Sequence, residues 1–336
     1  MLARLGRGRA STGPTLPLVA TFGVERGTWR GEVALVLRAG DTTAVFLPHL
    51  GMTGVSLRRS RREFLAVPGG PNALRAGHTG GLPLLAPWAN RLGVGAPGRA
   101  RSYRAAGVTV PVPRRGRLHR DGTGLPIHGL FVGRGDWQVT ERAGPRTSGA
   151  RGSGGGATFT AALDVDDPVF PFPHRLGLSV RLDQGRLRVT TTIVPTARRR
   201  VPVAFGWHPY LRVPVAPRSR WRLRLPAREH LLLDARGLPT GERVPVAAEA
   251  APVGRRTFDD LFALGRIRVL GLEHDDGALT LRSDAGFPFA QVWVPPGRPF
   301  AALEPMTAAT DALGTGTAPL VSPGDQFAAT FTLTVE

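Results

Sequence analysis

The chain has 336 residues, enough for one large domain or two of ordinary size. Its 44 cationic residues outnumber its 25 anionic ones and give a net charge of +19, and every cation is an arginine because the sequence contains no lysine. The hydrophobic content of 42% supplies a core and excludes a chain that is disordered throughout. The absence of cysteine excludes disulfides and thiol chemistry, and the absence of lysine excludes a Schiff base and a Walker-type phosphate loop.

The N-terminal region carries arginines and then a short apolar patch at residues 16–22, which Pro17 interrupts. No small-residue cleavage site follows the patch at the distance typical of a signal peptide. No stretch of the chain approaches the roughly 18 consecutive apolar residues of a membrane span. We therefore expect a cytoplasmic protein without a membrane partner, in which residues 1–16 form a disordered tail.

Apolar and polar residues alternate with a period of two along much of the chain, most clearly at residues 33–37, 176–182 and 327–335. This period predicts half-buried strands of antiparallel sheets. No segment carries a helical apolar stripe over three turns, and a single helical turn is expected at 257–264. Glycine and proline turns separate the strands, so the sequence predicts an all-β sandwich or barrel.

The glycine-rich stretch at 143–157 fits either a linker between two domains or a long hairpin loop. The strands expected on its two sides are alike, and the motifs described below fall on both sides of it. We interpret it as a flexible loop inside one domain that spans residues 17–336.

Most arginines alternate with apolar residues, as at 221–225, which places them on the solvent face of a strand. Denser clusters occur at 58–62 and 198–200, and such clusters are what a polyanion would bind. Aromatic residues are not interleaved with these clusters as they are in proteins that bind single-stranded nucleic acid. We therefore expect no nucleic-acid partner.

Two of the eight histidines lie between apolar or aromatic residues and next to glycine or proline. His128 stands in Leu-Pro-Ile-His-Gly-Leu, and His208 stands in Phe-Gly-Trp-His-Pro-Tyr. A histidine in such a setting is more often a packed core or turn residue than a catalyst, although aromatic neighbours also tune an imidazole for proton transfer. The other six histidines, His174 among them, are expected to be solvated loop residues.

Three groups of polar residues are further candidates. Glu304 follows the apolar stretch Phe-Ala-Ala-Leu, where burial would raise the pKa of its carboxyl toward the range of a general base. The alternative interpretation is that Glu304 lies at a strand end, where its carboxylate points to water or pairs with an arginine. Asp259 and Asp260 are a second candidate for a functional role, and the alternative interpretation is that they serve in a turn or as a cap. Asn90 and Arg91 combine a planar amide with a fork-shaped donor, which suits the recognition of hydroxyl or carboxylate groups.

Other kinds of site fit the sequence less well. The two histidines and Glu304 lack the short spacing of a local metal site, so we expect no metal and no cofactor. Asp259 and Glu304 would supply the two carboxylates that a glycosidase needs. The two prominent histidines are a weak argument against a glycosidase. No serine lies in Gly-x-Ser-x-Gly, and no glycine-rich segment lies between a predicted strand and a helix.

Eight segments form an ordered set of motifs: Gly51-Met52-Thr53-Gly54, Gly81-Leu82-Pro83-Leu84-Leu85-Ala86-Pro87-Trp88-Ala89-Asn90-Arg91-Leu92, Ile127-His128-Gly129-Leu130 followed by Trp137, Phe170-Pro171-Phe172-Pro173, Gly206-Trp207-His208-Pro209-Tyr210, Leu238-Pro239-Thr240-Gly241, Phe258-Asp259-Asp260-Leu261-Phe262 and Leu303-Glu304-Pro305. Each motif is weak alone. Their order, which covers residues 30–336, resembles the aldose 1-epimerase (galactose mutarotase) family.

The resemblance implies a single-domain antiparallel β-supersandwich of the galactose mutarotase type. It also implies an isomerase that interconverts the α and β anomers of a free aldose such as galactose or glucose. Opening the ring needs one group to take the proton of the C1 hydroxyl and another to give a proton to the ring oxygen. By the family pattern Glu304 is the base, His208 the acid and His128 an assisting group, with no metal or organic cofactor. The contacts to the sugar hydroxyls are then Asn90, Arg91 and Asp259.

The sequence departs from the family pattern near both histidines. The first motif reads His128-Gly129-Leu130 where many members have His-Gly-Gly. An asparagine that many members carry before the second motif is absent from residues 193–196. Asp259 and Asp260 compete for one role, and the position after Phe258 favours Asp259.

These departures leave the substrate open. One alternative is a hexose-6-phosphate 1-epimerase whose phosphate is held by Arg58, Arg59 or Arg61 of the cluster at 58–62. Another is a non-catalytic sugar-binding protein on the same fold. In each case the partner is a small-molecule sugar, and the sequence predicts no oligomeric state.

Overall fold

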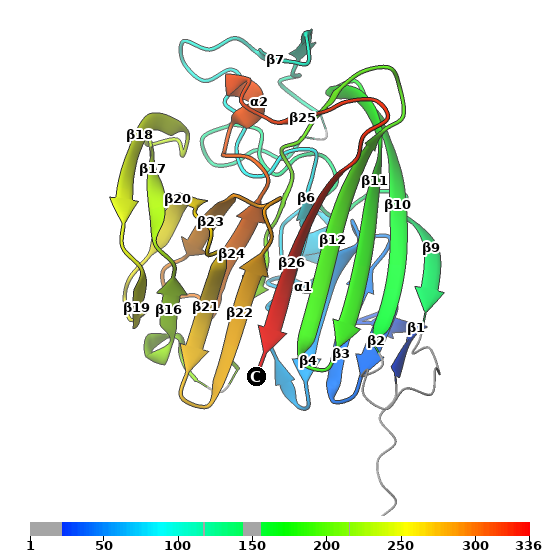
Figure 1. Ribbon diagram of the computed structural model, residues 1–336, viewed down its shortest axis with the longest axis vertical. Helices are drawn as coiled ribbons and strands as arrows, with labels where there is room; N and C mark the ends of the chain where they lie inside the picture. Colours follow the sequence, from blue (N-terminus) through cyan, green and yellow to red (C-terminus); the bar gives the residue numbers. More distant parts are fainter. Residues whose placement is uncertain (1–21, 117, 144–155, 215) are drawn as a thin grey trace, which may run out of the picture.

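Antiparallel strands account for most of the structure, which forms three large sheets and two small ones (Figure 1). The computed structural model describes residues 22–116, 118–143, 156–214 and 216–336. The tail expected at 1–16 and most of the loop expected at 143–157 lie outside these residues.

The first layer is a nine-stranded sheet. Its strands are β9 (Gln138–Ala143), β10 (Ala157–Asp167), β11 (Phe170–Asp183), β12 (Arg186–Pro195), β16 (Arg222–Leu225), β19 (Glu249–Pro252), β21 (Val269–His274), β22 (Gly277–Ser283) and β26 (Phe327–Val335). Their spatial order is β19-β16-β21-β22-β26-β12-β11-β10-β9, with β26 in the middle (Figure 1). Thr158 pairs with Ala143, so the glycine-rich stretch joins two adjacent strands of one sheet.

The second layer consists of an eight-stranded and a five-stranded sheet. The larger contains β6 (Leu84–Leu85), β14 (Gly206–Trp207), β15 (Tyr210–Leu211), β17 (Arg228–Leu233), β18 (Pro239–Val246), β20 (Phe258–Leu264), β23 (Phe289–Val294) and β24 (Ala301–Met306). Its order is β18-β17-β20-β23-β24-β14-β6, and β15 also pairs with β24. The smaller sheet runs in chain order through β1 (Phe22–Trp29), β2 (Glu32–Ala39), β3 (Thr42–Leu47), β4 (Thr53–Arg59) and β5 (Arg62–Glu63).

Short elements connect these sheets. Single bridges from Gly54 to Leu82 and from Leu65 to Leu211 join the two sheets of the second layer. The two-stranded pairs are β7 (Ser102–Ala105) with β8 (Val108–Pro111), and β13 (Val201–Pro202) with β25 (Leu320–Val321). The helices are α1 (Gly70–Arg75), α2 (Ala312–Thr315) and the 3-10 turn η1 (Arg218–Arg220). Neither α-helix has the length or the run of apolar residues that crossing a membrane would take.

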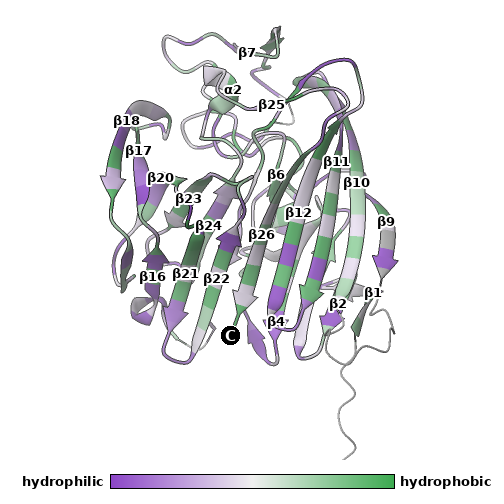
Figure 2. Ribbon diagram, viewed as in Figure 1, coloured by the Kyte–Doolittle hydropathy of each residue, from purple (hydrophilic) through white to green (hydrophobic). Residues whose placement is uncertain are grey.

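The predicted alternation is seen directly in the strands. Leu176, Leu178, Val180 and Leu182 of β11 are buried, whereas the residues between them are more exposed. The same pattern runs along β26, and Figure 2 shows it as alternating bands on β11 and β12. The apolar faces of both layers contribute to one continuous core. The all-β, antiparallel prediction is therefore confirmed.

Several local predictions are wrong. Residues 258–264 form β20 and not a helical turn, because both edges of this segment pair with neighbours, β17 on one side and β23 on the other. His230 and His274 are not loop residues, because they lie in β17 and β21, and His174 is neither in a loop nor solvated. It lies in β11 on the same buried face as Phe172, is 2% exposed, and its Nδ1 is 2.7 Å from the carbonyl of Phe172.

Candidate active site

A cavity of about 190 Å³ lies where β24 and the segment after β14 meet the loops around residues 90 and 128. All six residues predicted from the sequence to act in catalysis or sugar binding line this cavity. The lining residues are Thr79, Asn90, Arg91, Ile127, His128, His208, Tyr210, Asp259, Trp293 and Glu304.

A carboxyl and an imidazole make direct contact in this cavity. Glu304 Oε1 lies 3.2 Å from His208 Nε2, and the two side chains are only 2% and 6% exposed. Burial raises the pKa of Glu304 well above its usual range, and the negative charge of Asp259 raises it further. Burial also lowers the pKa of His208 to about 3. Both shifts favour the uncharged forms of the two groups, a protonated carboxyl and a neutral imidazole.

The same pair has free hydrogen-bonding capacity. Glu304 Oε2 and His208 Nδ1 are buried, and neither has a hydrogen-bond partner among the residues that the structure describes. Buried polar atoms in folded proteins are nearly always bonded. Glu304, which carries one of these two atoms, lines the cavity.

Aromatic side chains fix the His208 ring. It stacks on Tyr210 with ring centroids 4.7 Å apart and an angle of 19° between the planes, and the Trp293 ring packs at 74° to it with centroids 5.6 Å apart. The Tyr210 hydroxyl is in turn hydrogen-bonded to Thr79 at 2.6 Å. This packing leaves the imidazole little freedom to rotate away from Glu304.

His128 lies across the cavity from this stack. Its ring is 5.4 Å from that of His208 and nearly perpendicular to it. The backbone is unusual here, because His128 has φ +64° and donates from its N–H to the carbonyl of Asn90, which itself has φ +55°. At the next residue, Gly129, a Cβ atom would overlap the carbonyl of Ala86. Glycine is therefore required beside this histidine.

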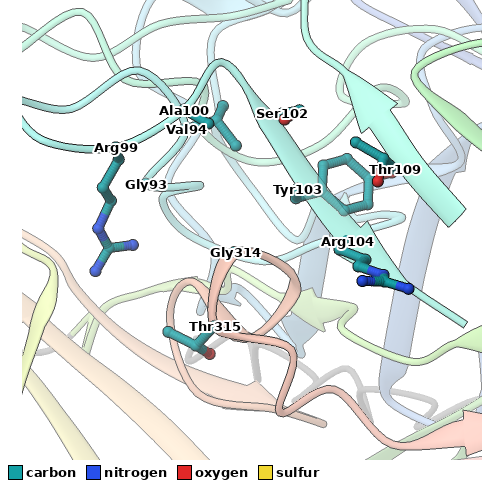
Figure 3. A pocket seen from close by; sticks show the side chains of 10 residues that line it. All are labelled: Gly93, Val94, Arg99, Ala100, Ser102, Tyr103, Arg104, Thr109, Gly314 and Thr315. Atoms are coloured by element: carbon teal, nitrogen blue, oxygen red, sulfur yellow. The ribbon is translucent and has the colours of Figure 1, made fainter. Parts of the chain in front are cut away.

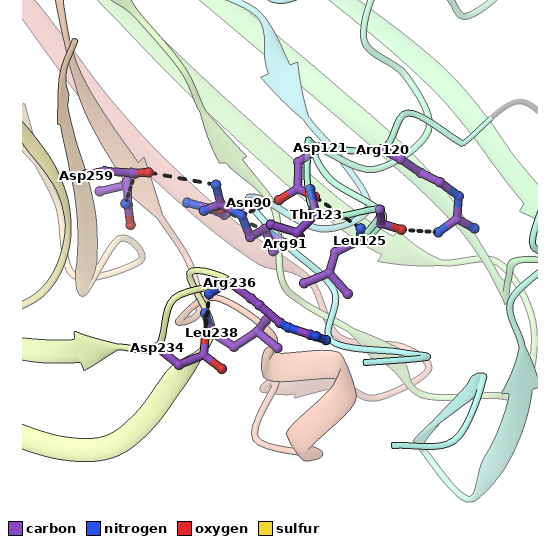
Figure 4. Close-up of polar contacts among 12 residues, drawn as sticks. Asn90, Arg91, Arg120, Asp121, Thr123, Leu125, Asp234, Arg236, Leu238 and Asp259 are labelled. Carbon is purple, nitrogen blue, oxygen red and sulfur yellow. Dashed lines mark hydrogen bonds and ion pairs between the residues drawn. The ribbon is translucent and has the colours of Figure 1, made fainter. Parts of the chain in front are cut away.

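Arg91 and Asp259 add charged groups to the cavity wall (Figure 4). Arg91 Nη2 is 3.8 Å from Asp259 Oδ2, and Arg91 Nε donates to Asp121 Oδ2 at 2.6 Å. Asp259 Oδ1 accepts a hydrogen bond of 2.7 Å from Gln291. Asp260 does not line this cavity; its carboxylate is 3.1 Å from His230.

The sequence alone did not point to several residues that complete the site. Tyr210 and Trp293 line the cavity, and Gln291 and Asp121 hold two of its charged groups in place. A signal exists for Gln291, which is the one polar residue in the apolar strand β23 and is 1% exposed. No local signal exists for Asp121, because its partner Arg91 belongs to a different loop.

The arginine cluster at 58–62 is not part of the site, and none of its residues lines the cavity. Arg59 pairs with Asp41 and donates to the carbonyl of Val335, and Arg62 donates to the carbonyl of Asp276. The cluster therefore does not supply the phosphate-binding residues expected for a hexose-6-phosphate substrate.

A larger cavity of about 650 Å³ lies between β7 and α2, with Arg99, Tyr103 and Thr315 in its wall (Figure 3). None of the predicted site residues lines it, and the Tyr103 hydroxyl is already bonded to the carbonyl of Val169. Across the described parts of the chain, no three His, Asp or Glu side chains are grouped as ligands of a metal ion. The smaller cavity, which holds the carboxyl–imidazole pair, is the candidate active site.

The structure is a β-sandwich protein with a buried carboxyl–imidazole contact in the wall of a polar cavity. A sequence model described as aldose 1-epimerase matches residues 36–334. The chain therefore belongs to the aldose 1-epimerase family, which places it among the carbohydrate epimerases and confirms the predicted family. A comparison with curated proteins gives no match.

Solved structures show the same fold at low sequence identity. A galactose mutarotase-like protein from Clostridium acetobutylicum is 18% identical, with a TM-score of 0.78 over 93% of this chain and 98% of the other. Galactose 1-epimerase from Lactobacillus acidophilus is 14% identical, with a TM-score of 0.70 over 94% and 99%. An aldose epimerase homologue from C. elegans is 14% identical, with a TM-score of 0.68 over 88% and 95%. These similarities confirm the predicted galactose mutarotase type of fold.

Proposed function

We propose that this chain is an aldose 1-epimerase, which interconverts the α and β anomers of a free aldose such as galactose or glucose. The observation that carries the proposal is the buried contact of 3.2 Å between His208 Nε2 and Glu304 Oε1 in the wall of a polar cavity. The reaction needs one proton acceptor and one proton donor close together, and this pair supplies both.

In the proposed reaction, the Glu304 carboxylate takes the proton of the C1 hydroxyl while the His208 imidazolium gives a proton to the ring oxygen. The bond between C1 and the ring oxygen breaks, and an open-chain aldehyde forms. Rotation about the C1–C2 bond presents the other face of the aldehyde, and the two proton transfers then run in reverse. The pair ends in its starting state, so no other reactant is consumed.

Burial of the pair favours the ring-opening step. The step starts from the charged form of the pair, a carboxylate and an imidazolium, which burial disfavours, and converts it into the uncharged form, a carboxyl and a neutral imidazole, which burial favours. Because burial raises the pKa of Glu304 and lowers that of His208 to about 3, it strengthens both the base and the acid. In this scheme Arg91 and Asp259 bind sugar hydroxyls with Asn90, and His128 assists at the ring oxygen or a neighbouring hydroxyl.

Replacing the proposed base tests the scheme. Glu304→Gln keeps the size of the side chain but removes the proton acceptor, so we expect anomer exchange to slow by roughly 10²–10⁴-fold. The measurement is polarimetry of freshly dissolved α-D-glucose and α-D-galactose, with circular dichroism to show that the variant is folded. Glu229→Gln, which alters an exposed carboxyl on β17, is the matched control. Full activity of Glu304→Gln would remove Glu304 from the role of base.

A double variant tests whether Glu304 and His208 act as a unit or independently. If Glu304 and His208 serve one proton-transfer cycle, then Glu304→Gln/His208→Gln is expected to be about as slow as either single variant. Losses that multiply would argue against a shared cycle. Wild-type protein that binds these sugars without accelerating exchange would instead be a non-catalytic sugar-binding protein. A clear preference for the 6-phosphates would make the substrate a hexose phosphate.

A further inference from the structure

The hairpin of β7 and β8 presents a group of hydrogen-bond donors to the cavity of about 650 Å³, here called the hairpin cavity. Ser102 and Arg104 lie two residues apart in β7, so their side chains are on the same face of the strand. Thr109 of β8 stands directly opposite Arg104 in the register of the two strands. All three residues line the hairpin cavity, so one face of the hairpin supplies a guanidinium and two hydroxyls to its wall.

The wall of the hairpin cavity carries positive charge and no negative charge. Arg99 and Arg104 both line it, and Figure 3 shows the two side chains well apart. Thr315 adds a third hydroxyl, and the wall contains no aspartate or glutamate. Arg104 is exposed, and within the described part of the chain it has no ion-pair or hydrogen-bond partner. Guanidinium and hydroxyl donors without a competing carboxylate are suited to a phosphate group.

The volume of the hairpin cavity indicates a ligand larger than a phosphate ion. Cavities of about 300–1,000 Å³ are typical of sites for drug-sized molecules, and the hairpin cavity lies within that range at about 650 Å³. A phosphate bound at Arg104 leaves room in the part of the cavity that Arg99 and Thr315 line. The hydroxyls of a sugar would find hydrogen-bond partners there.

Arg99 connects the hairpin cavity to the candidate active site. Its guanidinium pairs with the carboxylate of Asp311, whose side chain is fully buried. The other oxygen of that carboxylate accepts from the N–H of Gly93 at 2.6 Å, and the N–H of Asp311 donates to the carbonyl of Arg91. Arg91 lines the cavity that contains Glu304. A ligand bound to Arg99 is therefore linked through Asp311 to the segment that binds the aldose in the proposed scheme.

Two glycines in the wall of the hairpin cavity pack directly against the carboxylate of Asp311. A Cβ atom at Gly93 would overlap both this carboxylate and the guanidinium of Arg99, and a Cβ atom at Gly314 would overlap the carboxylate as well. Moving Arg99 away would leave a buried carboxylate without its cation, which is strongly unfavourable. A ligand therefore binds Arg99 where it stands, and it stabilises the contact between Arg99 and Asp311.

We propose that the hairpin cavity binds a phosphate monoester of a sugar, and that this ligand strengthens the binding of an aldose in the cavity that contains Glu304. The coupling rests on the proposed function, whereas the binding site does not. The bound ester holds Arg99 on Asp311, and Asp311 holds the segment that carries Arg91. Because coupling between two binding sites is reciprocal, each ligand lowers the Kd of the other by the same factor.

Isothermal titration calorimetry with α-D-galactose 1-phosphate tests the binding site. The C1 oxygen of this probe is esterified, so the probe cannot undergo anomer exchange. We expect Arg104→Gln to weaken its binding by roughly tenfold or more, the effect of losing a charged hydrogen bond, and Arg104→Lys to retain part of the affinity. Inorganic phosphate is the second probe, and we expect it to bind roughly tenfold more weakly than the ester. Arg266→Gln, which alters an exposed arginine outside the cavity wall, is the matched control.

A titration with D-galactose tests the coupling. It is run with and without galactose 1-phosphate, at an ester concentration that saturates the wild type but not Arg104→Gln. We expect the ester to lower the Kd of galactose by roughly fivefold in the wild type and to have little effect in Arg104→Gln.

The outcomes separate the binding site, the coupling and the proposed function. Equal affinity of the wild type and Arg104→Gln for the ester overturns the site. Weaker ester binding in the presence of galactose also overturns it, because the ester then occupies the cavity that contains Glu304. Inorganic phosphate that binds as tightly as the ester overturns the assignment of a sugar ligand. Ester binding that depends on Arg104 but leaves the Kd of galactose unchanged overturns the coupling. If no sugar exchanges its anomers faster, the proposed function is wrong, and ester binding through Arg104 still supports the site.

Discussion

Arg91 is held in position by Asp121, a residue that does not line the cavity containing Glu304. The side chain of Asp121 has two separate tasks, since Oδ1 closes its own turn and Oδ2 accepts from Arg91 Nε. An Asn at this position keeps the first task and loses the second. Asp121 is therefore a positioning residue that can be tested without breaking its turn.

For Asp121→Asn we expect KM for a free aldose to rise by roughly tenfold, the cost of one weakened charged hydrogen bond, with kcat changed much less. Steady-state kinetics on α-D-galactose measures this split, and thermal unfolding checks that the fold is retained. A purely structural role would lower the unfolding temperature and leave KM unchanged. That result would show that Arg91 does not depend on Asp121.

His174 gives the folded state a dependence on pH. Burial lowers the pKa of His174, although its hydrogen bond to Phe172 opposes the shift. The folded-state pKa therefore lies below the unfolded value of about 6.5. The stability that comes from the neutral ring is present above that value and is lost as the pH falls toward the folded-state pKa.

We therefore expect His174→Phe to lose less thermal stability than the wild type between about pH 7.5 and about pH 5. Differential scanning calorimetry at several pH values measures the difference between the two unfolding temperatures. His49→Gln, at an exposed histidine, is the control and should follow the wild type. A gap between wild type and His174→Phe that stays constant with pH would contradict the assignment.

At the level of single residues, the sequence signals the buried carboxyl of Glu304 more clearly than the buried imidazole of His174. Glu304 stands out because a carboxylate among apolar residues needs a reason to be there. His174 shares its face with Phe170, Phe172 and Leu176, and the alternation that predicted a strand at 176–182 extends back to it. The alternation on the C-terminal side of His174 is therefore the signal that places it in a strand.

Among the elements, α2 has an effect beyond its size. Its four residues follow Asp311, whose side chain is fully buried and whose Oδ1 accepts from the N–H of Gly93 at 2.6 Å. The same carboxylate pairs with Arg99, and the N–H of Asp311 donates to the carbonyl of Arg91. The start of α2 therefore anchors the segment that carries Asn90 and Arg91.

Asp311→Ala should lower the free energy of unfolding by about 1–3 kcal/mol, because the buried N–H of Gly93 loses its acceptor. Urea denaturation followed by fluorescence measures the change. Asp325→Ala, which alters an exposed aspartate, is the control. Stability equal to that of the wild type would mean that α2 does not anchor the segment.

Strands were predictable from alternation, but their neighbours were not. The local pattern at 327–335 correctly predicts β26. Nothing in that pattern shows that β26 pairs with residues 186–193 on one side and 279–283 on the other. The error at 258–264 has the same cause. A segment with mixed periodicity becomes a strand when two neighbours complete its hydrogen bonds, and those neighbours are far away in the sequence.

On the scale of the whole molecule, the candidate active site is assembled from segments around residues 90, 128, 208, 259 and 304. No spacing rule joins segments so far apart, so composition and periodicity did not predict that they meet. The ordered motifs, read as a family resemblance, implied that meeting.

The central place of β26 also bears on how the chain is made. The ribosome completes β12 well before it reaches β26, and at about 5–20 residues per second the wait is on the order of ten seconds. During that time the edge of β12 has no partner strand, and unpaired edges are sites where nascent chains aggregate. Arg186 and Arg188 place two exposed charges at the start of this strand. We expect part of the arginine excess to serve here, keeping an unfinished sheet in solution until its last strand arrives.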